Sequence, residues 1–82
     1  MHNFFVLLSS INDVKQFVNA ACAQPCDIDV VSGRYIIDAK SIMGLFSLDL
    51  AKPIKVEVHG TDDDARRFFE AVKPFIVENV SE

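Results

Sequence analysis

The sequence predicts an α+β protein, an open-faced β-sandwich in which one sheet carries helices on a single face. Segments with helical spacing of apolar residues alternate along the chain with short strand-like segments, in the order β-α-β-β-α-β-α. Three apolar helix stripes need one common surface, and a single sheet covered on one face provides it. Because 82 residues suffice for one core, we expect a single domain spanning residues 1–82. The element order alone leaves other α+β arrangements open.

The first half of the chain predicts a strand, a helix and a hairpin. Residues 3–8 form an apolar run long enough for one buried strand. Ser10 and Asp13 resemble a capping box, with Asn12 as the competing cap. The helix that follows has one apolar stripe, made by Val14, Phe17, Val18, Ala21 and Cys22. After Gln24-Pro25, strands are expected at 27–31 and 34–39, joined by a two-residue turn at Ser32-Gly33.

The second half predicts a short helix, a strand and a longer helix. The short helix runs from Ser41 to about Ser47, and residues 54–58 alternate as a half-buried strand. Thr61 and Asp64 form a second capping box, and the acidic run 62–64 is interpreted as helix capping rather than a metal site. The apolar side of this helix consists of Ala65, Phe68, Phe69, Val72, Phe75 and Ile76. Pro74 predicts either a kink or an end near Lys73.

Composition excludes several classes of partner. The net charge is −4 and the basic residues are scattered, which argues against nucleic acid and an anionic membrane. No apolar run is long enough to span a bilayer and no signal-like segment is present, so we expect a cytoplasmic protein. Cys22 and Cys26 are expected to be reduced thiols, with Cys22 in the core. We expect no cofactor, no metal and no catalytic constellation, and therefore not an enzyme.

The short helix carries a family resemblance. Its segment Ala39–Leu48 places large apolar residues on a helix too short to bury them all, and an exposed apolar patch usually marks a protein contact. The segment resembles the second helix of HPr, the small phosphocarrier protein of the bacterial sugar phosphotransferase system. The resemblance extends from Phe4 to about Val77 and implies four antiparallel strands with three helices on one face.

The phosphocarrier motif of that family is altered here. HPr proteins carry the phosphoryl group on a histidine at the start of the first helix, within a Gly-Leu-His-Ala-Arg-Pro-like motif. Alignment on residues 16–18 places Ser10 at the histidine, Asn12 at the arginine and Asp13 at the proline. A serine phosphate is a low-energy ester, and a carboxylate at Asp13 would repel a phosphate. Neither His2 nor His59 replaces the histidine by position in the chain. We therefore expect no histidine phosphocarrier activity, and interpret Ser10 as an N-cap.

The regulatory serine of the family has a counterpart. Ser41 resembles the residue that an ATP-dependent kinase phosphorylates in many Gram-positive members, and a phosphate there adds about two negative charges at a helix start. By the resemblance, Ile42, Met43 and Phe46 form the hydrophobic half of a partner contact, and Lys40 holds the phosphate or a partner carboxylate. The simpler interpretation is that Ser41 is an N-cap and the apolar residues pack inside the protein.

The function predicted is that of a regulatory protein-binding module. By resemblance, the partner of the Ser41–Ser47 helix is enzyme I, HPr kinase or a transcription regulator, and the chain is a monomer or a weak dimer. The family contains a catabolite-repression paralogue that lacks the histidine, keeps the serine and acts as a corepressor. Two alternatives stay open: a small-molecule-sensing domain of the ACT type, and an active phosphocarrier that accepts phosphate on Ser10 or His59.

Overall fold

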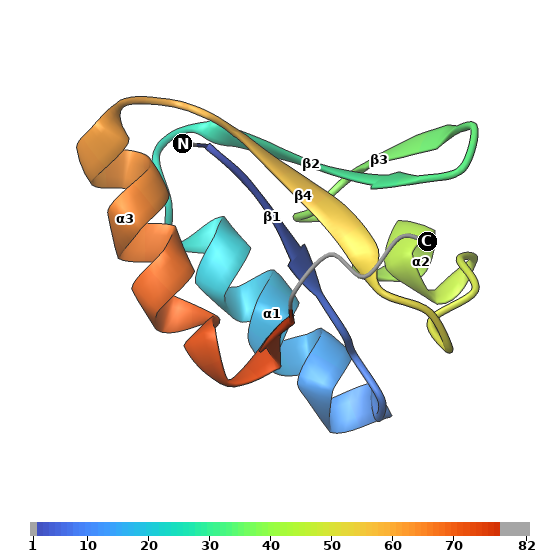
Figure 1. Ribbon diagram of the computed structural model, residues 1–82. Coiled ribbons are helices and arrows are strands. Elements are labelled where there is room, and N and C mark those ends of the chain that lie inside the picture. Colours follow the sequence, from blue (N-terminus) through green and yellow to red (C-terminus); the bar gives the residue numbers. More distant parts are fainter. Residues whose placement is uncertain (1, 78–82) are drawn as a thin grey trace.

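The structure, a computed structural model, describes residues 2–77 and has the predicted order of elements (Figure 1). Two short elements, η1 and β5, follow the last helix. The elements are β1 (Asn3–Val6), α1 (Ile11–Cys22), β2 (Asp27–Ser32), β3 (Tyr35–Asp38), α2 (Ile42–Phe46), β4 (Ile54–His59), α3 (Asp62–Ala71), the 3-10 helix η1 (Lys73–Phe75) and β5 (Ile76–Val77). Within residues 2–77, no helix has the length and apolar character needed to cross a membrane.

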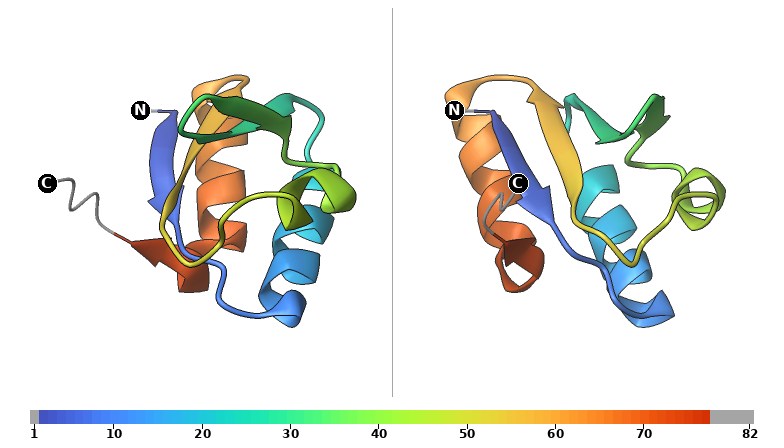
Figure 2. Two further views of the ribbon diagram at one scale, coloured as in Figure 1. Left: turned by 90° about the vertical axis from the view of Figure 1, so that its right-hand side faces the viewer. Right: turned by 45° about the vertical axis from the view of Figure 1, so that its right-hand side comes forward.

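The strands form one antiparallel sheet in the order β3-β2-β4-β1-β5. The sheet has five strands rather than the four expected, because Ile76 and Val77 pair with Val6 and Phe5 at the edge next to β1. Figure 2 shows α1 and α3 on the same side of this sheet, while α2 contacts α1 and β3. The α+β open-faced sandwich is therefore confirmed.

The core lies between the sheet and the helices. β2 and β4 alternate, so that Ile28 and Val30 in one strand and Ile54, Val56 and Val58 in the other are buried. From the helical side, Phe17 of α1 and Phe68 of α3 are completely buried and meet edge to face, with ring centroids 5.5 Å apart. An aromatic pair of this geometry contributes about 0.5–1.5 kcal/mol beyond the area that it buries. This contact helps fix α1 and α3 beneath the sheet.

Pro74 ends the last helix rather than kinking it. α3 stops at Ala71, and Pro74 lies in the 3-10 turn Lys73–Phe75. Proline has no N–H to continue the helical hydrogen bonds, so the chain leaves the helix before it. The assignment of Phe75 and Ile76 to the helical stripe was wrong, since they lie in the turn and in β5. Both still pack against the core.

Two local predictions also need correction. The hairpin turn is Gly33-Arg34 rather than Ser32-Gly33, because Ser32 pairs with Tyr35. Gly33 has a φ of +60°, the left-handed conformation expected of a glycine in such a turn. Cys22 is exposed and not in the core. It lies eight residues after Val14, or about 80° around the helix, which places it at the edge of the apolar stripe.

Candidate functional site at the start of the first helix

Ser10 caps α1. Its backbone is extended and its Oγ accepts a hydrogen bond from the Asp13 amide at 3.1 Å. The Asp13 carboxylate turns back to Ser9, where Oδ2 accepts from both the amide and the hydroxyl at 3.1 Å. The helix therefore has the predicted serine cap, but the carboxylate reaches Ser9 instead of closing a box on Ser10. Ser9, Ser10 and Asp13 satisfy one another's hydrogen bonds at the helix entrance.

This network fixes a negative charge beside Ser10, the residue that the alignment above places at the histidine of HPr proteins. The hydrogen bond from the Ser9 amide, assisted by the Ser9 and Ser10 hydroxyls, lowers the pKa of Asp13 despite an opposing effect of desolvation. Asp13 is therefore ionised at neutral pH. The positive end of the helix dipole favours an anion here, and the protein's own carboxylate already supplies one. A phosphoryl group on Ser10 would meet a like charge.

Within residues 2–77, no arginine bonds to Ser9, Ser10 or Asp13 at this helix entrance. Asn12, which the alignment above places at the arginine of the motif, is exposed. Arg66 and Arg67 belong to α3 and pair with Asp63 and Asp64, while Arg34 lies in the turn between β2 and β3. The bidentate anion contact that an arginine provides is thus not built into α1.

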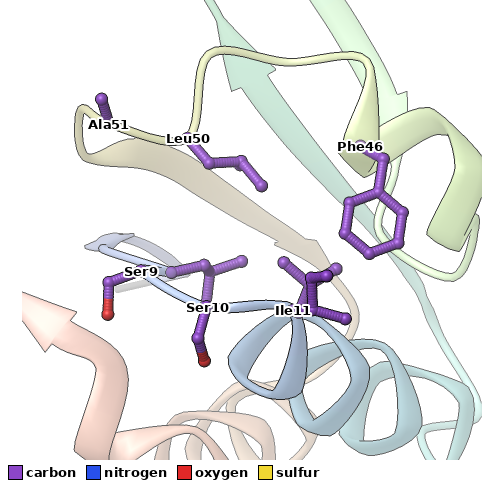
Figure 3. Close-up of a pocket in the computed structure, with 8 residues that line it drawn as sticks. Ser9, Ser10, Ile11, Phe46, Leu50 and Ala51 are labelled. Carbon is purple, nitrogen blue, oxygen red and sulfur yellow. The ribbon is translucent and has the colours of Figure 1, made fainter.

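Beside this polar cap lies an apolar pocket of about 400 Å³ (Figure 3). Residues from the connection after β1 and from the first turns of α1 form one wall, and residues from the end of α2 onward form the other. The lining consists of Leu8, Ser9, Ser10, Ile11, Val14, Phe46, Leu50 and Ala51. In Figure 3, Ile11, Leu50 and Phe46 lie around one space, and the two serine hydroxyls point away from it. The pocket brings together the start of α1 and the end of α2, which the sequence predicted as separate sites.

α2 presents part of its apolar surface to solvent. Leu45 is completely buried and Ile42 packs against the core, whereas Met43 is 77% exposed and Phe46 42% exposed. The side chain of Ile11, on the opposite wall of the pocket, is 65% exposed. We call Ile11, Met43, Phe46 and Leu50 the α1–α2 surface. An exposed apolar group of this kind is typical of a protein contact.

Ser41 and Lys40 precede this short helix. Ser41 is exposed and caps α2, with its Oγ accepting from the Gly44 amide at 3.2 Å. Lys40 is partly buried, and its ammonium donates to the Gln24 carbonyl oxygen at 3.2 Å, so it is tied to the end of α1. The hydroxyl of Ser41 is thus accessible, while Lys40 also has a packing role.

Sequence reasoning missed Ile11 and Leu50 as members of the surface. Ile11 lies three residues before Val14, so the helical stripe itself extends to it. That spacing could have assigned Ile11 to the apolar side, but it does not show that Ile11 lies at the exposed end of the helix. Leu50 belongs to an irregular connection without periodicity, and only the fold brings it to the pocket.

The two histidines lie at the far end of β1 from Ser10. The Val58 amide donates to the His2 carbonyl oxygen at 2.9 Å, which places His2 beside the end of β4, where His59 also lies. His2 contacts Asp62 and His59 contacts Asp29, at 2.7 and 3.0 Å. In the acidic run, Asp62 pairs with His2, Asp63 with Arg66, and Asp64 completes the capping box with Thr61. Capping is therefore confirmed for Asp64, whereas Asp62 and Asp63 form side-chain pairs instead.

An antiparallel sheet with helices on one face, and an apolar surface beside the capped start of its first helix, define a small α+β domain of the open-faced sandwich type. The family model for the PTS HPr component phosphorylation site matches residues 12–78. The chain therefore belongs to the HPr family. The match begins two residues after Ser10, so it does not include the position aligned with the phosphohistidine.

Two solved structures have the same fold. HPr-C-His from Thermoanaerobacter tengcongensis superposes with a TM-score of 0.73 at 23% identity, over 90% of this chain and 89% of that one. Phosphocarrier protein HPr from Bacillus anthracis str. Ames gives 0.67 at 26% identity, over 92% and 95%. No curated protein sequence matches. The family assignment favours the HPr interpretation over the ACT-type alternative.

Proposed function

We propose that this HPr-family protein is a regulatory protein-binding module without histidine phosphocarrier activity. Two observations at α1 together support the proposal. Ser9, Ser10 and Asp13 hydrogen-bond to one another at the start of the helix, and the α1–α2 surface beside them is exposed. The polar half has lost the groups needed to carry phosphate. The apolar half keeps what is needed to hold a partner.

The absence of carrier activity follows from chemistry at Ser10. A carrier must hold its phosphoryl group in a bond that is readily broken, and a serine ester does not meet that need. The Ser10 hydroxyl accepts from the Asp13 amide, and the ionised carboxylate of Asp13 would repel an incoming phosphoryl donor. The alternative acceptor His59 has an Asp29 oxygen at 3.0 Å and a Glu57 oxygen at 4.0 Å, which would also repel one. The geometry thus argues against a non-standard acceptor at either position.

Regulation would act through Ser41. Its exposed hydroxyl caps α2, two residues before the most exposed apolar side chain of that helix, Met43. A phosphate would add about two negative charges and three acceptor oxygens beside the α1–α2 surface. It would also replace the hydrogen bond from the Gly44 amide, so the orientation of a five-residue helix would depend on it. The modification would then favour a partner with an arginine at this position and disfavour one with an acidic group.

The partner that we propose is a protein of the sugar phosphotransferase system or its regulation. HPr proteins interact with proteins such as enzyme I, and the α1–α2 surface is the place where this chain would meet enzyme I, an HPr kinase or a transcription regulator. The module would work in the cytoplasm as a monomer or weak dimer, and would not itself be an enzyme. Lys40, Ile42, Met43 and Phe46 remain the predicted contact residues, joined now by Ile11 and Leu50.

The kinase test uses intact mass. After incubation with HPr kinase and ATP, we expect a gain of one phosphoryl group that Ser41→Ala abolishes. Ser10→Ala serves as the matched control, because Ser10 is also an exposed serine N-cap. A gain that survives in Ser41→Ala, or no gain at all, would contradict regulation at Ser41.

The docking test is a titration with enzyme I followed by amide NMR shifts. We expect shifts at Ile11, Met43 and Phe46, and a loss of affinity of about tenfold or more in Phe46→Ala, since partly exposed aromatic anchors often dominate such contacts. Ile36→Ala on β3 is the control, because Ile36 is 67% exposed and lies outside the surface. Equal losses in both variants, or shifts confined to β3, would contradict docking on the α1–α2 surface.

A further inference from the structure

A second group of side chains with ligand atoms lies on the face of the sheet opposite α1 and α3, away from the α1–α2 surface. In β2 and β4 the buried residues alternate with Asp29, Glu57 and His59, which therefore point to the opposite face from α1 and α3. Asp29 and Glu57 are directly opposite each other in the register of the two strands. Each of the three residues offers one ligand atom within 4.8 Å of the other two. We propose that these residues bind a divalent transition-metal ion such as Zn²⁺.

The distances suit such an ion. His59 Nε2 lies 3.0 Å from Asp29 Oδ2 and 4.0 Å from Glu57 Oε1. Ligand atoms around a tetrahedral Zn²⁺ lie about 3.3 Å apart, which follows from metal–ligand distances of about 2.0–2.2 Å. The separations of 3.0 and 4.0 Å between His59 and the two carboxylates fall on either side of that value. Small rotations of the side chains would therefore bring all three atoms onto one ion without moving the strands.

The donor set identifies the class of metal. One imidazole and two carboxylates suit Zn²⁺ and its neighbours in the first transition row, whereas Ca²⁺ and Mg²⁺ prefer oxygen ligands alone. Three protein ligands leave at least one coordination position for water or an outside ligand. The side chains are between 29% and 50% exposed, so an ion can enter directly from solvent.

The surroundings add negative charge and hold one ligand in place. Asp38 of β3 pairs with Asp29, and Asp27 pairs with His59, so both carboxylates face the same side as the cluster. Lys55 Nζ lies 3.4 Å from Glu57 Oε2, and this leaves Oε1 directed toward His59. A divalent cation would offset the excess of carboxylates on this face. The ligands also stand on paired central strands, which hold their backbone positions.

The test is isothermal titration of the untagged full-length protein with ZnCl₂ in a non-chelating buffer at pH 7. We expect saturable binding of one ion per chain, and at least a tenfold loss of affinity in His59→Gln and in Asp29→Asn. At a free Zn²⁺ concentration of ten times Kd, the ion should raise the Tm of the protein by about 5–10 °C.

Two controls separate this cluster from other metal-binding groups. His2→Gln removes the other histidine–carboxylate pair, His2 with Asp62, and should leave affinity unchanged. A Cys22→Ser/Cys26→Ser variant removes both thiols and should also leave it unchanged. The proposal fails if no saturable binding is found, or if binding survives His59→Gln, or if either control abolishes it. NMR of the imidazole protons should show His59, and not His2, shifting as the ion is added.

Discussion

At the scale of single residues, the proposed absence of carrier activity depends most on Asp13. Its carboxylate accepts a hydrogen bond from the Ser9 amide, and its backbone amide donates to the Ser10 hydroxyl oxygen. One residue therefore engages the Ser10 hydroxyl and also contributes the negative charge at the start of α1. Substitution of the histidine alone would have left an anion site formed by the helix amides. With Asp13 present, its own amide is bonded to Ser10 Oγ and its carboxylate lies beside the helix start on Ser9, so a bound anion would meet a like charge.

Gly33 supports a prediction at the same scale. It has a φ of +60°, and a Cβ added there would meet no atom within 4 Å, so only backbone strain opposes a side chain. Gly33→Ala should therefore lower the free energy of unfolding by about 1–2 kcal/mol. Urea denaturation measures this loss. Gly33→Asn should lose less, because asparagine adopts the left-handed conformation more readily. An alanine variant as stable as the parent would contradict the turn geometry.

At the scale of elements, α2 can lie close to β3 because Gly44 has no side chain at their contact. A Cβ on Gly44 would lie 2.6 Å from Ile37 Cγ2 and 3.1 Å from Ser41 Oγ. We predict that Gly44→Ala destabilises the protein by about 1–3 kcal/mol through overpacking, although alanine is the better helix former.

A double-mutant cycle checks the cause of this loss. If the contact with Ile37 is responsible, Gly44→Ala should cost clearly less in an Ile37→Ala background, as expected for residues in contact. The free energies of unfolding from urea denaturation give the coupling. Purely additive losses would show that α2 does not approach β3 as the structure has it.

The element order was predictable from sequence because it depends on local patterns. Helical spacing around Phe17 and Phe68 and alternation at Val56 are properties of short segments, and each proved correct. The hairpin turn was displaced by one residue because strand register depends on pairing with Tyr35, which a local pattern does not contain.

At the scale of the whole molecule, the site was harder to predict than the fold. Ser10 and Phe46 are 36 positions apart and meet at one pocket only because α1 packs on α2. β5 has two residues, and its pairing with β1 depends on where the Pro74 turn directs the chain. The resemblance to HPr identified the relevant segments, but their contact is a product of tertiary packing.

The pH dependence of stability is also a property of the whole molecule. Asp13, Asp62 and Asp64 have pKa values below the ordinary 3.8, caused chiefly by hydrogen bonds from the Ser9 amide, His2 and the Thr61 amide, respectively. A carboxyl whose pKa is lowered by folding stabilises the protein above its unfolded pKa. That contribution is lost as pH falls through the folded value.

We therefore predict that the urea midpoint falls steadily once the pH drops below about 4, near the ordinary carboxyl pKa. Urea denaturation between pH 7 and pH 2.5 measures it. A variant with Asp13→Asn and Asp64→Asn should be less stable at pH 7 and should lose less on acidification. A midpoint in the parent that stays constant down to pH 2.5 would contradict these carboxylate contacts.

Phosphotransfer from enzyme I is the measurement that tests the central proposal most directly. The protein is incubated with enzyme I and phosphoenolpyruvate, beside a histidine-containing HPr as positive control, and its intact mass is recorded. We predict no change in mass, because Ser10 is a cap and Asp13 repels the donor. A variant with Ser10→His, Asn12→Arg and Asp13→Pro should gain one phosphoryl group if the fold and docking surface are intact. A gain of one phosphoryl group by the unaltered protein would contradict the account.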